Sequence, residues 1–281
     1  MSAILKNNFS VLNSAEFVNS IYSASSNLYI GVGRSVEWEN EIVPPTPTDT
    51  IAEDVDFRNN LIGIKRVQLT NVIPIVPRVQ WAAGMVFKPI ETTAVNGERA
   101  TTYYCINRLN YVYECIYTPS VGAVTGVGGE PDTMADSITT ADGFKWKFLY
   151  DITPQMVNNN LLLDNWIPVP YNKHGVYPGG SLTANQHNYG DSLANITLSA
   201  YRVLINVTIS DEGTSIPYTA SFRQVGLLAN PLDNSATRLA GDNYASTAFD
   251  TDSGELLYLE NRRVINRMEG QSETLEMIIT F

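Results

Sequence analysis

Short segments rich in β-branched and aromatic residues recur along this chain of 281 residues. Residues 144–152 (FKWKFLYDI) show the pattern best, because every second residue from Phe144 to Tyr150 is aromatic. In an extended backbone these rings share one face, as in a half-buried strand. Further strands are predicted at 27–33, 61–69, 72–79, 101–107, 111–118, 196–209, 218–228, 255–260 and 275–281. Many short strands separated by turns predict a mainly β fold, a two-layer β-sandwich or embellished jelly roll.

A few short helices are expected beside the strands. Asn13 and Glu16 have capping-box spacing, so the first helix is predicted to start at Asn13. A second is predicted after Thr153-Pro154, where a capping residue precedes a proline at the first helical position, and it would run to about Asp164.

Long loops are predicted where Gly, Pro, Asn and Ser accumulate. The length of the chain suits one large domain or two modest ones, and we expect a single elaborated β-sandwich domain over residues 1–281. Pro44, Pro45 and Pro47 stiffen the first loop and exclude it from a sheet interior, because proline fixes φ and lacks an N–H donor. By the same argument, the strand at 72–79, which contains two prolines, should lie at an edge or contain a bulge. The loops are expected near 35–60, 119–141, 170–195 and 229–253.

The charge balance excludes two classes of partner. The net charge is −11, and the longest basic runs are the pairs Lys65-Arg66 and Arg262-Arg263. Binding to nucleic acid or to an anionic membrane needs a basic surface, so neither is expected. No run of 18 apolar residues and no signal peptide is found, so we expect synthesis in the cytoplasm. The 15 tyrosines fit either protein interfaces or simply a β-rich fold.

No constellation of residues indicates catalysis. His174 and His187, the two histidines, do not have the spacing of a zinc site. The glycine-rich run Gly122–Gly129 (GAVTGVGG) lacks the Lys-Ser/Thr that follows a phosphate cradle, so it is interpreted as a flexible loop. We therefore expect no enzymatic activity, no catalytic residue, no metal and no cofactor.

The two cysteines fall in one predicted hairpin. Its strands contain Cys105 and Cys115, and the turn is centred near Asn110. A disulfide across the hairpin is geometrically conceivable, but a reducing cytoplasm favours two packed thiols.

Four segments, in their order along the chain, carry a resemblance to a known family. They are Asn27–Arg34 (NLYIGVGR) with Trp38 and PPTPTD after it, Asp142–Tyr150 (DGFKWKFLY) leading to Trp166-Ile167-Pro168-Val169, Phe222–Pro231 (FRQVGLLANP), and Gly254–Phe281. Together they resemble the gene product 8 family, the baseplate wedge proteins of T4-like phages with contractile tails. The resemblance implies a jelly-roll-like β architecture and a homodimer that contacts other wedge proteins in the virion tail baseplate. It also implies no enzymatic activity.

Two regions are expected to contact such partners. One contains Trp38, an aromatic anchor, together with the proline loop, and the other is the arginine pair near the C-terminus. The arginines would pair with acids or carbonyls of a neighbour, although an intramolecular salt bridge at a strand edge explains them equally well. An alternative function is a carbohydrate-binding or glycan-degrading tail protein, an analogy based on the fold alone. The expected contact residues are Trp38, Pro44, Pro45, Pro47, Arg262 and Arg263.

Overall fold

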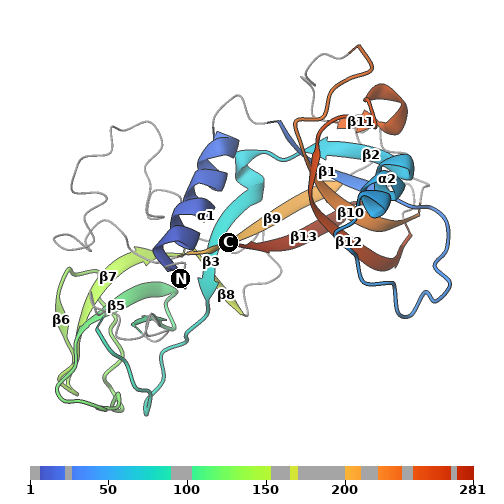
Figure 1. The fold of residues 1–281 in the computed structure, drawn as a ribbon. Coiled ribbons are helices and arrows are strands. Elements are labelled where there is room, and N and C mark those ends of the chain that lie inside the picture. The colour runs from blue at the N-terminus through green and yellow to red at the C-terminus, as the bar shows by residue number, and fades with distance from the viewer. Residues whose placement is uncertain are drawn as a thin grey trace, which may run out of the picture. The chain divides into compact units, whose positions relative to one another are not determined.

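The fold is described from a computed structural model (Figure 1). It describes residues 7–22, 27–89, 103–152, 165–169, 200–209, 221–235, 243–266 and 271–281. Strands predominate and form several antiparallel sheets, which confirms the predicted mainly β class. The two-layer jelly-roll arrangement stays a prediction.

The chain divides into two compact units. The first unit comprises residues 1–16, 73–203 and 280–281, and the second unit comprises residues 17–72 and 204–279. The expectation of a single domain over 1–281 stays a prediction beside this division. The second predicted helix, the expected loop at 170–195 and both histidines lie outside the described residues.

Two α-helices are described, and both differ from expectation. Helix α1 (Asn7–Tyr22) contains Asn13 in its interior, so the predicted start of the first helix is wrong. Helix α2 (Ile51–Asn59) lies inside the expected loop at 35–60 and was not predicted. Its N-cap is Thr50, whose side chain accepts a hydrogen bond from the backbone N–H of Glu53, and two acidic residues in the first turn favour the helix dipole.

A five-stranded sheet belongs to the second unit. Its strand order is β11-β2-β1-β10-β12. The strands are β11 (Asn243–Ala245), β2 (Leu61–Arg66), β1 (Leu28–Gly33), β10 (Phe222–Ala229) and β12 (Glu255–Ile265). The predicted strands at 27–33, 61–69, 218–228 and 255–260 all correspond to members of this sheet, so the period-2 pattern located them correctly.

Two glycines on neighbouring strands of this sheet make room for helix α2. Gly31 on β1 lies directly opposite Gly226 on β10. A Cβ atom on Gly226 would lie 2.4 Å from Cζ of Phe57, and one on Gly31 would lie 3.3 Å from the same atom. Phe57 is fully buried in this depression, so a tertiary contact anchors the short helix on the sheet.

A four-stranded sheet has the order β13-β9-β3-β8. Its strands are β13 (Glu273–Thr280), β9 (Arg202–Ile209), β3 (Val72–Pro77) and β8 (Trp166–Pro168). Because β3 lies between β9 and β8, an edge position, one of the two alternatives predicted from its prolines, is wrong, and the bulge stays a prediction. Proline loses only its donor, and the carbonyl of Pro74 still accepts a 2.8 Å hydrogen bond from the N–H of Val169.

The remaining sheet belongs to the first unit and has the order β4-β5-β7-β6. Its strands are β4 (Tyr104–Ile106), β5 (Tyr111–Tyr117), β7 (Lys145–Asp151) and β6 (Ile138–Thr139). The predicted β4–β5 hairpin is confirmed, and Asn110 takes a φ of 62° in its turn. Cys105 faces Tyr113, so the two cysteines are diagonal neighbours, and both are free and buried. Burial raises the pKa of the Cys115 thiol to about 12, which keeps it protonated.

The alternation predicted along 144–152 holds at one end of β7 and fails at the other. Phe144 and Trp146 are fully buried in a cluster that also contains both cysteines. Further along, Leu149 and Tyr150 are both buried in a second cluster. The register between β5 and β7 shifts at this point, so Leu149 is the extra residue of a bulge that reverses the alternation.

A buried acid lies on the central strand of the same sheet. Glu114 is 5% exposed and lies opposite Tyr104 on β4 and Lys147 on β7. Burial raises the pKa of Glu114 to about 7, although the charge of Lys147 acts in the opposite direction. This carboxyl is therefore about half protonated at neutral pH.

Candidate protein-contact surface

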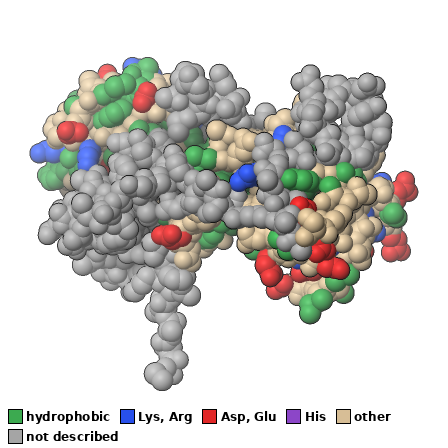
Figure 2. All heavy atoms as spheres, turned by 90° about the horizontal axis from the view of Figure 1, so that it is seen from above, with side chains coloured by type: hydrophobic (Ala, Val, Ile, Leu, Met, Phe, Trp, Pro, Cys, Tyr) green, Lys and Arg blue, Asp and Glu red, His purple; other side chains and the backbone are tan. Residues whose placement is uncertain are grey.

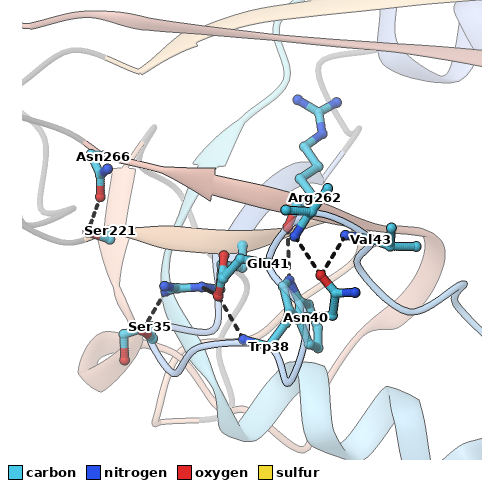
Figure 3. Close-up of polar contacts among 10 residues, drawn as sticks. Ser35, Trp38, Asn40, Glu41, Val43, Ser221, Arg262 and Asn266 are labelled. Atoms are coloured by element: carbon cyan, nitrogen blue, oxygen red, sulfur yellow. Dashed lines mark hydrogen bonds and ion pairs between the residues drawn. The ribbon is translucent and has the colours of Figure 1, made fainter.

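The loop at residues 34–50 in the second unit is fixed to strand β12 (Figure 3). The indole Nε1–H of Trp38 donates to the carbonyl of Arg262 at 2.9 Å. The amide of Asn261 donates to the carbonyl of Pro45 at 3.1 Å, and Nε of Arg263 donates to the carbonyl of Ile42 at 3.0 Å. The two regions predicted separately are thus brought together along one strand.

These contacts hold the loop along a free edge of the sheet. Strand β12 is at the end of its sheet, so alternate residues direct backbone groups away from β10. The loop satisfies one of these groups with a side chain, because the indole of Trp38 binds the carbonyl of Arg262. Prolines 44, 45 and 47 have no N–H to add to the ladder, so the loop covers the edge without becoming a strand.

An ion pair between a buried arginine and a half-buried glutamate holds the loop from the other side. Nε of Arg223 on β10 lies 2.7 Å from Oε1 of Glu41, and the Arg223 side chain is 6% exposed. Arg223 also donates to the carbonyl of Ser35 at 2.6 Å, while Glu41 accepts from the backbone N–H of Trp38 at 2.8 Å. Burial raises the pKa of Glu41, but the hydrogen bond from Arg223, the other N–H donors and the arginine charge lower it more. The pKa of Glu41 is therefore lowered from its ordinary value of 4.5, and the carboxylate is ionised at neutral pH.

A cation stacks on the aromatic anchor. The guanidinium carbon of Arg34 lies 3.9 Å from the centroid of the Trp38 ring, and Nη1 of Arg34 lies 3.4 Å from a carboxylate oxygen of Asp56. Asp56 belongs to helix α2, so this chain of contacts joins the loop to the helix. Trp38 therefore supports the loop in addition to covering the sheet edge.

The arginine pair is engaged within the subunit. Nη2 of Arg262 lies 2.8 Å from a carboxylate oxygen of Glu260 and donates to the carbonyl of Glu276 at 2.9 Å. Arg263 is exposed and bonds to the loop carbonyl described above. The intramolecular salt bridge, one of the two interpretations left open by the sequence, is therefore present at Arg262. A role of either arginine at an interface stays a prediction.

Aliphatic side chains project from this fixed scaffold into solvent. We call them the loop–helix surface: Val36, Ile42, Val43, Ile51 and Val55. Their exposed fractions range from 48% for Val55 to 83% for Ile51. Acidic residues lie between them in the sequence, and Figure 2 shows acidic and hydrophobic side chains next to one another on the described surface. Exposed aliphatic side chains with charged residues between them are typical of protein interaction sites.

The described residues contain neither a cluster of metal-ligating side chains nor a membrane-spanning helix. Within those ranges, no group of three or more His, Cys, Asp and Glu side chains is placed to hold a metal ion. No helix in the described part of the chain is long and apolar enough to cross a membrane. The arrangement at the loop is suited to contact with another protein.

Comparison with known proteins identifies the family. The family model described as bacteriophage T4 Gp8 matches residues 116–281. This chain belongs to the Gp8 family. The baseplate wedge protein gp8 of Enterobacteria phage T4 is 26% identical over an alignment of 336 positions, which covers 99% of this chain and 97% of that protein. The resemblance inferred from the four segments is therefore confirmed, and within the matched range lie Arg223, Arg262 and Arg263.

Proposed function

We propose that this member of the Gp8 family is a structural subunit of a phage tail baseplate wedge. The similarity to the T4 wedge protein over almost the whole of both chains supports this role. The subunit would act without catalysis and without a cofactor, by binding neighbouring wedge proteins in the virion after assembly in the host cytoplasm. It would form a homodimer, and it would bind neither nucleic acid nor membrane, in keeping with its net charge of −11.

The loop–helix surface is the part of the subunit that we assign to a wedge partner. The observation that carries this assignment is a loop fixed by side-chain bonds to β12 while Val36, Ile42 and Val43 remain 62%, 70% and 66% exposed. A loop held in place before binding loses little conformational entropy when the complex forms. The proline loop would form the rim of the same contact.

The test removes apolar surface and leaves the scaffold intact. In the double variant Ile42→Ser with Val43→Ser, the backbone N–H groups of both residues still donate to Oδ1 of Asn40, at 3.0 and 3.3 Å. We expect the variant to fold normally but to lose co-purification with the co-expressed baseplate proteins of its phage. Leu257→Ser is the matched control, because this β12 side chain is also exposed and aliphatic. Wild-type complex formation by the double variant would contradict the assignment.

The arginine pair needs a more careful test. Replacing Arg262 and Arg263 by alanine should lower wedge assembly, but it also removes the bonds to Glu260, to the Glu276 carbonyl and to the Ile42 carbonyl. Assembly of this variant is therefore to be compared with its own melting temperature. Full assembly would show that neither arginine serves an interface.

The homodimer is tested with the isolated chain. Mass photometry should report a particle of twice 31.0 kDa, and a monomer at micromolar concentration would contradict the proposal. Nothing among the described residues specifically favours the carbohydrate-binding or glycan-degrading alternative.

A further inference from the structure

Two tight turns follow one another at residues 120–129 in the first unit. The N–H of Ala123 donates to the carbonyl of Ser120 at 3.1 Å, and the N–H of Gly129 donates to the carbonyl of Gly126 at 3.0 Å. The third residue of each turn is a glycine with positive φ: 75° at Gly122 and 82° at Gly128. A turn with this geometry needs glycine at its third position and leaves the second free. The second positions are occupied by Val121 and Val127.

The residue between the turns fixes them to the body of the unit. Thr125 is 2% exposed, and its hydroxyl donates to the carbonyl of Ala82 at 2.6 Å and accepts from the N–H of Met85 at 3.0 Å. Its backbone N–H donates to the carbonyl of Met85 at 2.9 Å, and its carbonyl accepts from the N–H of Gly84 at 2.8 Å. The interpretation of Gly122–Gly129 as a flexible loop thus gives way to a segment held at its centre.

A half-buried carboxylate fixes the second turn. Oδ2 of Asp142 accepts from the N–H of Gly126 at 2.8 Å. A Cβ atom on Gly129 would lie 2.1 Å from the same oxygen, so only glycine permits this close approach. The glycines in this run are therefore explained by turn geometry and by Asp142.

The valines at the turn positions have little contact with the rest of the chain. Val121 and Val127 are 104% and 96% exposed, and Val124 and Val86, which form an isolated bridge, are 54% and 40% exposed. We call these four residues the valine turns. No charged residue occurs at 119–129 or at 79–87. In a chain with 17% charged residues, about three would be expected in these 20 positions, so the local composition is unusually apolar.

We propose that the valine turns insert into an apolar, uncharged groove on a neighbouring baseplate protein. This inference rests on the proposed wedge function and adds a second contact, on the first unit. The turns are anchored at Thr125 and Asp142 and their valines project into solvent, so they suit a concave partner, and binding would cost little ordering of the chain. The groove must lack unpaired charges, because valines offer no partner for a buried charge. A lipid surface is disfavoured because neither segment contains the Lys or Arg residues that bind anionic headgroups.

The experiment measures dissociation constants for the full chain. The double variant Val121→Ser with Val127→Ser keeps both glycines and the Thr125 anchor. The probes are the other baseplate proteins of the same phage, purified and titrated one at a time by isothermal calorimetry. Burying one valine side chain contributes roughly a factor of ten in affinity, so we expect the Kd for one partner to rise at least tenfold. Leu109→Ser, an exposed aliphatic side chain in the same unit, is the matched control and should leave this Kd unchanged.

The outcomes separate the two levels of the proposal. Failure of the wild-type chain to bind any of the probes would contradict the wedge function itself. Equal Kd values for wild type and double variant, with wild-type binding present, would overturn the valine-turn contact alone. The valine-turn contact would also be overturned if the double variant bound every protein probe normally and instead lost self-association or binding to phosphatidylcholine vesicles. If the serine variant melts early, Val121→Thr with Val127→Thr, which preserves the side-chain shape, replaces it in the same comparison.

Discussion

Replacing Glu114 by glutamine should make the subunit more stable at pH 8 and leave its stability almost unchanged at pH 4.5. Burial raises the pKa of Glu114 to about 7, against 4.5 for an ordinary glutamate. The folded state therefore binds this proton more tightly than the unfolded state does. Between pH 4.5 and 7 the unfolded chain loses the proton first, so the free energy of unfolding falls as pH rises.

The size of the effect follows from the pKa difference. A difference of about 2.5 pKa units corresponds to about 3 kcal/mol, because each unit is worth about 1.4 kcal/mol. Below pH 4.5 both states hold the proton, and above pH 7 both have lost it, so the full difference appears by about pH 8. Glutamine keeps the size of the side chain and carries no charge, so the variant should escape this loss.

The assay is urea unfolding followed by tryptophan fluorescence at several pH values between 4.5 and 8.5. The quantity that matters is the difference in unfolding free energy between variant and wild type, since the titrations of other groups cancel in it. Asp151→Asn, at an exposed carboxylate on the next strand, controls for the loss of a negative charge. A difference that stays constant across this pH range, or a variant that is less stable at pH 8, would refute the argument from burial.

Three further changes test the scaffold of the second unit. Trp38→Phe should lower the unfolding free energy by about 1 kcal/mol, because it removes the hydrogen bond to the Arg262 carbonyl and keeps a ring for stacking; urea unfolding measures the loss. Gly226→Ala should cost about 1–3 kcal/mol by forcing Phe57 to move, and an unchanged melting temperature would disprove this contact. Glu41→Gln should speed proteolysis of the 34–50 loop. Because the pKa of Glu41 is lowered in the folded wild type, its contribution to stability is complete above pH 4.5 and is lost as the pH falls further. Acid should therefore speed proteolysis of the loop in the wild type and have no such effect on the variant.

The sequence predicted the longer strands well because each of them carries its own evidence, whereas the short strands β6, β8 and β11 were not predicted. Side chains that alternate between core and solvent leave a period-2 pattern that needs no knowledge of partners. Helix α2 carries no such evidence, since Phe57 is its one residue described as buried. Its anchor is a depression made by two glycines on separate strands, so the helix depends on contacts that exist only after the sheet has formed.

The candidate surface was predicted only in part, because its residues come together only in the folded chain. Trp38 and Arg262 were both predicted as contact residues, but they are 224 positions apart, and only the fold brings them together at the edge strand β12. Glu41 and Arg223 were missed because no local motif joins residues 182 positions apart. The bulge at Leu149 was missed similarly, since a register shift depends on the facing strand.

The loop that covers β12 has a consequence for how the family can diverge. An open strand edge attracts any extended peptide, because main-chain pairing is nearly blind to side-chain identity. With the carbonyl of Arg262 occupied from within and the loop held along the strand, binding along this stretch must rely on side chains. Each phage lineage can then alter its interfaces one substitution at a time, together with its own partners, while the underlying sheet stays the same.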